Sequence, residues 1–116
     1  MTKTRYSSGL PMATVVIGAH EIECVIDTGF DGSLMLPTNI IQKFDLKKAT
    51  TIQCLLADGT LSQKDLFEGE IIWLGQKITT RIVAMDADFA LIGMKLLADA
   101  RTTMHPAKNI LTIELS

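Results

Sequence analysis

Between Val25 and Pro37 the chain reads VIDTGFDGSLMLP, a turn-forming segment enclosed by two apolar runs. Two β-branched residues precede Asp27-Thr28-Gly29, and the short strand Leu34–Leu36 follows before Pro37 ends it. A carboxylate is therefore placed on a tight turn between hydrophobic segments. Desolvation raises the pKa of a carboxyl group held among apolar groups, and a second carboxylate beside it makes one of the two an acid and the other a base. With a second carboxylate beside it, Asp27 would form a pair that can activate a water molecule.

Alternation of apolar and polar residues predicts β-strands along most of the chain. A first hairpin is expected around a turn at Gly18–His20. Asp58-Gly59, within a turn over Ala57–Thr60, is the strongest hairpin signal in the sequence. The predicted strands are Thr14–Ile17, Glu21–Ile26, Leu34–Leu36, Thr51–Leu56, a long run that ends at Leu74, Ile78–Met85, Phe89–Ile92 and Ile110–Leu115.

Two short helices accompany these strands. Asn39 followed by Gln42 resembles a capping box, which predicts a helix over Ile40–Phe44. One or two helical turns are expected over Met94–Ala100. With about eight strands and two short helices, the fold class is mostly β.

Composition limits what the chain can be. Its 116 residues correspond to a single domain, residues 1–116, and the net charge of −2 provides no electrostatic footprint for nucleic acid or an anionic membrane. No signal peptide or membrane span is recognisable, which favours a cytoplasmic protein. Cys24 and Cys54 lie outside any metal-ligand spacing and are predicted to be buried free thiols. We expect neither a metal nor a cofactor.

The segment Val25–Gly29 resembles the signature of retropepsin-like aspartic proteases, the single-domain relatives of the retroviral proteases and of pepsin. Those enzymes carry, in their second half, two apolar residues and a glycine before a short helix, and Leu91-Ile92-Gly93 followed by Met94–Leu97 is similar. Their flap, a β-hairpin that closes over the substrate, lies between the two motifs, as does the Asp58-Gly59 hairpin. The resemblance covers nearly the whole chain and implies a single-domain acid protease barrel with a flap hairpin.

A narrower resemblance extends from Asp27 to Pro37. This stretch looks closer to a group of small prokaryotic proteins with the motif DTGF, which are predicted to be such proteases. Two positions depart from the retroviral pattern: Phe30 stands where a small residue is usual, and Met94 stands where those enzymes place an arginine.

The resemblance implies an aspartic endopeptidase that is active as a homodimer, because the chain has a single Asp-Thr-Gly. The catalytic residues would be Asp27, Thr28 and Gly29: the two Asp27 carboxylates flank a water, the Thr28 hydroxyls hydrogen-bond across the two-fold axis, and Gly29 leaves room for the backbone. An extended polypeptide substrate would lie between two groups of residues. One group is Phe30 and Asp31, and the other is the flap residues Leu56, Ala57, Asp58 and Gly59.

Two other interpretations remain open. Asp-Thr-Gly is also common turn chemistry, so the chain could be a retropepsin-like dimerisation or peptide-binding module without hydrolysis. It could also be an unrelated β-barrel that binds a small ligand. A structure without a crossed loop beneath Asp27 would favour the barrel.

Overall fold

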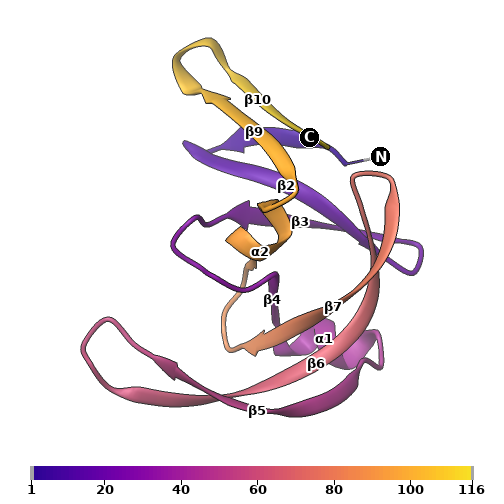
Figure 1. The fold of residues 1–116 in the computed structure, drawn as a ribbon, viewed down its shortest axis with the longest axis vertical. Coiled ribbons are helices and arrows are strands. Elements are labelled where there is room, and N and C mark those ends of the chain that lie inside the picture. The colour runs from indigo at the N-terminus through magenta and orange to yellow at the C-terminus, as the bar shows by residue number, and fades with distance from the viewer. Residues whose placement is uncertain (1, 116) are drawn as a thin grey trace.

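The computed structural model describes residues 2–115. Strands dominate this part of the chain, with two short α-helices and one 3-10 turn between them (Figure 1). The elements are β1 (Thr4–Ser7), β2 (Leu10–Ile17), β3 (His20–Ile26), β4 (Leu34–Pro37), α1 (Thr38–Lys43), β5 (Lys47–Leu55), β6 (Leu61–Trp73), β7 (Gln76–Met85), β8 (Ala90–Ile92), α2 (Met94–Leu97), β9 (Ala100–His105), η1 (Pro106–Lys108) and β10 (Ile110–Leu115).

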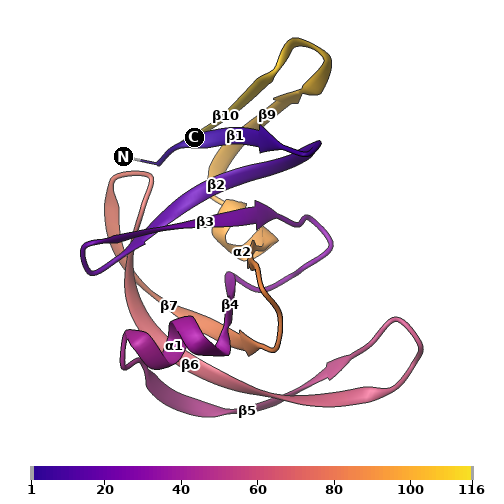
Figure 2. The same cartoon turned by 180° about the vertical axis from the view of Figure 1, so that it is seen from behind.

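Eight strands form one curved sheet in the order β1-β2-β3-β8-β4-β7-β6-β5. The sheet curls back on itself, because β2 also pairs with β6 where Val16 faces Ile72. The long strands β6 and β7 make the curved wall opposite β2 and β3, while β9 and β10 form a separate two-stranded hairpin at one end (Figures 1 and 2). The mostly β fold class with two short α-helices is confirmed.

The strand β8 lies between β3 and β4. It runs parallel to β3, with Ile92 opposite Ile26, and antiparallel to β4, with Ile92 opposite Leu34. The chain therefore leaves β3, passes through residues 27–33 and returns on the other side of β8. This is the crossed loop beneath Asp27, whose absence would have favoured the unrelated β-barrel.

Apolar residues from both sides of this crossing fill the core. Cys24, Leu34, Leu36, Ile82 and Ile92 are completely buried. These alternate positions along the strands are the ones whose side chains point to the inner face of the sheet. The apolar residues on either side of the Asp-Thr-Gly turn therefore anchor it to the core.

A buried indole ties α2 to the barrel. The Trp73 Nε1–H donates to the carbonyl oxygen of Leu96 at 3.1 Å, and both side chains are buried. A buried Trp normally needs such an acceptor. The helix that follows β8 is therefore held against the end of β6.

The structure corrects several predicted elements. Ten strands are present in residues 2–115 rather than about eight, because β1 and β9 were not predicted. Both strands are largely polar, and their pairing with β2 and β10 comes from backbone hydrogen bonds rather than from a hydrophobic face. The helix α2 ends at Leu97 and does not reach Ala100, because Ala100 is already the first residue of β9.

The predicted capping box is wrong. The helix α1 begins at Thr38 with Pro37 as its N-cap, and no side chain caps it. Asn39 therefore lies inside the first turn. Pro37 has no side-chain oxygen, so it cannot accept a hydrogen bond from the N–H groups of the first turn.

The two cysteines differ in exposure. Both are free thiols; Cys24 is buried as predicted, whereas Cys54 is only half-buried. Cys54 lies in β5, whose pairing with β6 extends beyond the core. No helix between residues 2 and 115 is long and apolar enough to cross a membrane.

Candidate active site

Hydrogen bonds hold Asp27 in one position at the end of β3. The Asp27 N–H donates to the carbonyl oxygen of Ile92 at 2.9 Å, which continues the pairing of β3 with β8 by one residue. The Gly29 N–H donates to Asp27 Oδ1 at 2.9 Å, and the Phe30 N–H donates to the Asp27 carbonyl oxygen at 3.1 Å. The carboxylate is half-buried, so the turn presents it at the rim of the barrel with a defined orientation.

The loop after Asp27 is braced by the chain that leaves β8. The Gly93 N–H donates to Ser33 O at 2.9 Å, the Met94 N–H to Phe30 O at 2.7 Å, and the Lys95 N–H to Gly32 O at 3.1 Å. A Cβ on Gly93 would lie 2.1 Å from Gly32 O and 2.7 Å from Phe30 O. Only glycine allows this close approach of two backbones. The segment around Gly93 therefore holds the loop after Asp27 in place through backbone hydrogen bonds.

Most of the remaining motif residues are exposed. Thr28, Gly29 and Asp31 are exposed in the single chain, and Phe30 is half-buried. These exposed residues flank a carboxylate held in one orientation, so the surface around Asp27 is open to a second molecule.

A cavity of about 610 Å³ opens beside Asp27. Its lining is mainly apolar and comes from the β1–β2 turn, β2, β3, β8 and the residue before β8. The lining residues are Ser7, Ser8, Leu10, Met12, Val25, Ile26, Asp27, Phe89 and Leu91. Such a site suits an apolar side chain next to a polar reacting group.

Sequence reasoning did not assign this cavity. Met12, Val25 and Leu91 lie opposite one another in the register of β2, β3 and β8, so they form one row across the sheet. All three are half-buried, whereas Cys24 and Ile26 on either side of Val25 are buried. The available signal is the period-two alternation within β3, but the alignment of the row depends on the pairing of distant strands.

The predicted hairpin around Asp58-Gly59 is present, and its role as a flap stays a prediction. The strands β5 and β6 are paired up to Leu55 opposite Leu61, and the turn is closed by the Leu56 N–H, which donates to Thr60 O at 2.8 Å. Asp58 Oδ1 accepts from the Thr60 N–H at 2.9 Å and from the Thr60 hydroxyl at 2.6 Å. These two hydrogen bonds, the hydroxyl first, lower the pKa of Asp58.

The hairpin tip and the Asp27 loop project to the same side of the molecule, on the left in Figure 1 and on the right in Figure 2. None of Leu56, Ala57, Asp58 or Gly59 lines the cavity beside Asp27. The structure therefore brings Asp27 together with Thr28, Gly29 and Phe30, while the predicted flap residues are at a separate tip. Within residues 2–115, no group of three His, Cys, Asp or Glu side chains could hold a metal ion.

Comparison with known proteins is informative only at the level of structure. No protein-family model matches the sequence, and no curated protein is significantly similar to it. Among solved structures, a retropepsin-like aspartic protease from Rickettsia conorii matches with a TM-score of 0.71 and 19% identity, over 97% of this chain and 88% of that chain.

Two viral enzymes match over a smaller share. The EIAV protease, solved with the inhibitor HBY-793, has a TM-score of 0.61 and 23% identity over 79% of this chain and 88% of its own. The simian foamy virus (mac) protease has a TM-score of 0.59 and 16% identity over 75% of this chain and 91% of its own. The chain thus has the fold of the retropepsin-like aspartic proteases. Its place in the narrower DTGF group stays a prediction.

Proposed function

We propose that the protein is an aspartic endopeptidase that works as a homodimer, with Asp27 of each copy flanking one catalytic water. One observation carries the proposal: a loop braced on both sides by β8 and α2 presents Asp27 at the rim of an apolar cavity. The sequence supplies this motif once in 116 residues, so the second carboxylate would come from a second copy.

The chemistry follows from two carboxylates that share a proton. The ionised carboxylate takes a proton from the water, whose oxygen attacks the peptide carbonyl carbon, while the protonated carboxylate donates to the carbonyl oxygen. When the resulting gem-diol collapses, the carboxyl group that took the proton from water passes it to the amide nitrogen, and the C–N bond breaks. The other carboxylate regains its proton from a gem-diol hydroxyl, so an amine and a carboxylic acid are released. Neither a metal nor a covalent intermediate is needed. Thr28 and Gly29 would position the two loops against each other across the two-fold axis.

The substrate in this proposal is an extended polypeptide. The cavity lined by Val25, Phe89 and Leu91 would take an apolar side chain next to the scissile bond. Main-chain groups near Phe30 and Asp31 would pair with the substrate backbone on one side. The flap residues Leu56, Ala57, Asp58 and Gly59 would close on the other side.

The test is cleavage of a mixed peptide library by the wild type and by Asp27→Asn. Asparagine keeps the shape of the side chain but removes its charge, so we expect hydrolysis to vanish while dimerisation and peptide binding largely survive. Asp86→Asn is the matched control, because Asp86 is exposed and does not line the cavity. Cleavage by Asp27→Asn at the wild-type rate would contradict the assignment.

The same experiment separates the protease from a non-catalytic binding module. A wild-type protein that binds peptides but cleaves none from acid to neutral pH would be the module. The extent of the domain, residues 1–116, and the cytoplasmic location stay predictions made from the sequence.

A further inference from the structure

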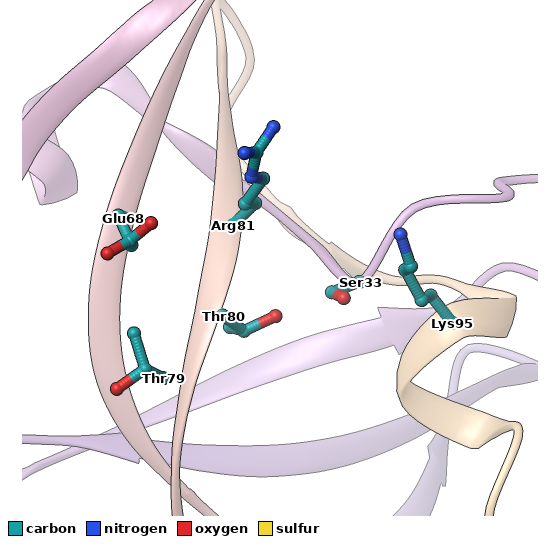
Figure 3. Close-up of a pocket in the computed structure, with 6 residues that line it drawn as sticks. All are labelled: Ser33, Glu68, Thr79, Thr80, Arg81 and Lys95. Atoms are coloured by element: carbon teal, nitrogen blue, oxygen red, sulfur yellow. The ribbon is translucent and has the colours of Figure 1, made fainter.

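A second, polar pocket of about 370 Å³ lies between β7 and α2, away from the cavity beside Asp27 (Figure 3). Its lining comes from four separate parts of the chain: the loop before β4, β6, β7 and α2. The lining residues are Ser33, Glu68, Thr79, Thr80, Arg81 and Lys95. None of them lines the cavity beside Asp27, so the proposed catalytic function does not account for this pocket.

Ser33 is one of the residues that line the pocket. The residue as a whole is 8% exposed, and its hydroxyl makes no hydrogen bond to any part of the chain that the structure describes. Figure 3 shows Ser33 between Arg81 and Lys95, with the Thr80 hydroxyl pointing toward it. The hydroxyl is open to the pocket, because Thr102 Oγ1 is the one buried side-chain polar atom without a partner in residues 2–115. The Ser33 hydroxyl is therefore free to donate a hydrogen bond to a ligand in the pocket.

The charges of the pocket favour an anion. In residues 2–115 neither Arg81 nor Lys95 forms an ion pair or a side-chain hydrogen bond. Glu68 lies opposite Arg81 in the register of β6 and β7. It also lies opposite Lys47 of β5, so its negative charge has a cationic neighbour on each side. The lining thus carries two cationic groups against one carboxylate, with three hydroxyls beside them. The lining therefore has an excess of one positive charge, which attracts an anion.

We propose that this pocket binds a phosphate group. The guanidinium of Arg81 can donate two parallel hydrogen bonds to phosphate oxygens, Lys95 supplies a second positive charge, and Ser33 and Thr80 supply neutral donors. The volume exceeds that of the phosphate itself, so the pocket accepts the group either free or as a phosphomonoester. The proposal does not depend on hydrolysis at Asp27.

Binding would connect elements that also hold the candidate active site. Ser33 lies in the loop after Asp27, and its carbonyl oxygen accepts from the Gly93 N–H. Lys95 lies in α2, and its own N–H donates to Gly32 O in the same loop. A phosphate held by Ser33, Lys95 and Arg81 would therefore link the Asp27 loop and α2 to β7. That link makes the pocket a candidate effector site.

The test is a titration of the full chain with inorganic phosphate and, separately, with phosphoserine, followed by the backbone amide shifts of Ser33, Arg81 and Lys95. Ionic strength is held constant with sodium chloride. We expect saturable shifts at these three amides. Saturation by either probe supports the site, and the tighter probe identifies the source as free phosphate or a phosphomonoester. Shifts that do not saturate, or that chloride produces equally, would overturn the proposal.

Single substitutions should change the phosphate affinity in opposite directions. Arg81→Gln should weaken phosphate binding by about tenfold or more, as expected for the loss of a charge-assisted pair. Glu68→Gln should instead tighten it by about threefold, because a nearby negative charge is removed. Lys108→Gln removes a cation from the separate β9–β10 end of the molecule and should leave the affinity unchanged. Equal weakening by Lys108→Gln and Arg81→Gln would show only non-specific screening and would refute the site.

Discussion

Gly93 has no space for a side chain, because a Cβ there would lie 2.1 Å from the carbonyl oxygen of Gly32. Gly93→Ala must push apart the two backbones that hold the Asp27 loop, so we expect the free energy of unfolding to fall by about 2–4 kcal/mol. Denaturant unfolding followed by the fluorescence of Trp73, the single tryptophan, measures the change.

Gly75→Ala is the comparison for this prediction. A Cβ on Gly75 meets nothing within 4 Å, but φ is +76°, so the cost is backbone strain alone, about 1–2 kcal/mol. If the two substitutions were equally destabilising, the close approach of β8 to the Asp27 loop would have no energetic importance.

The two thiols should differ in reactivity. Burial raises the pKa of Cys24 to about 12, so the thiol stays neutral and unreactive at neutral pH. This raised pKa stabilises the folded state below the ordinary value near 9.0, and the contribution is lost as pH rises from there toward 12. We expect one thiol per chain, that of Cys54, to react with a thiol reagent in the native protein, and two in denaturant. Cys54→Ser should leave none in the native state; rapid labelling of that variant would mean that Cys24 is accessible.

At the scale of elements, the β5–β6 hairpin should be mobile at its tip. Its strands are paired up to Leu55 and Leu61, but these two residues are 72% and 64% exposed. The tip therefore makes few packing contacts with the rest of the molecule. We expect the amides near Asp58 and Gly59 to exchange hydrogen much faster than those of Val25 and Ile26. Equal protection of the two regions would argue against a flap that opens for a polymer.

The turn at this tip should weaken in acid. Hydrogen bonds from Thr60 lower the pKa of Asp58, so the ionised carboxylate stabilises the turn above the ordinary pKa of 3.8. The stabilisation is lost as pH falls below 3.8 and through the lowered pKa. The amide shift of Thr60 in a pH titration reports the change. In Asp58→Asn the amide oxygen can still accept a hydrogen bond but does not titrate, so the shift should stay constant over this range.

At the scale of the whole molecule, the proposed site requires two copies. Sedimentation or light scattering over a range of concentrations should give about 25 kDa, twice the 12.7 kDa of one chain. Dimer formation should also survive Asp27→Asn, since that substitution preserves the shape of the turn. A monomer at every accessible concentration would remove the shared carboxylate pair, and with it the proposed mechanism.

The sequence by itself determined the local structures. The Asp-Thr-Gly turn between apolar runs, the Asp58-Gly59 hairpin and the final strand Ile110–Leu115 are all where the residues predicted them. Each depends on turn chemistry and on the alternation of neighbouring side chains. Such signals span only a few residues and need no knowledge of distant partners. The resemblance to retropepsin-like proteases added the overall fold.

Only the tertiary structure decided what the strands place side by side. The row formed by Met12, Val25 and Leu91 beside Asp27 exists because β2, β3 and β8 pair in one register. The polar pocket around Ser33 likewise joins residues up to 62 positions apart, from Ser33 to Lys95. The polar strands β1 and β9 could not be predicted from their own residues, because they are defined by their pairing with β2 and β10. Pairing between distant segments depends on backbone hydrogen bonds and on burial across the whole barrel, and neither leaves a local pattern in the sequence.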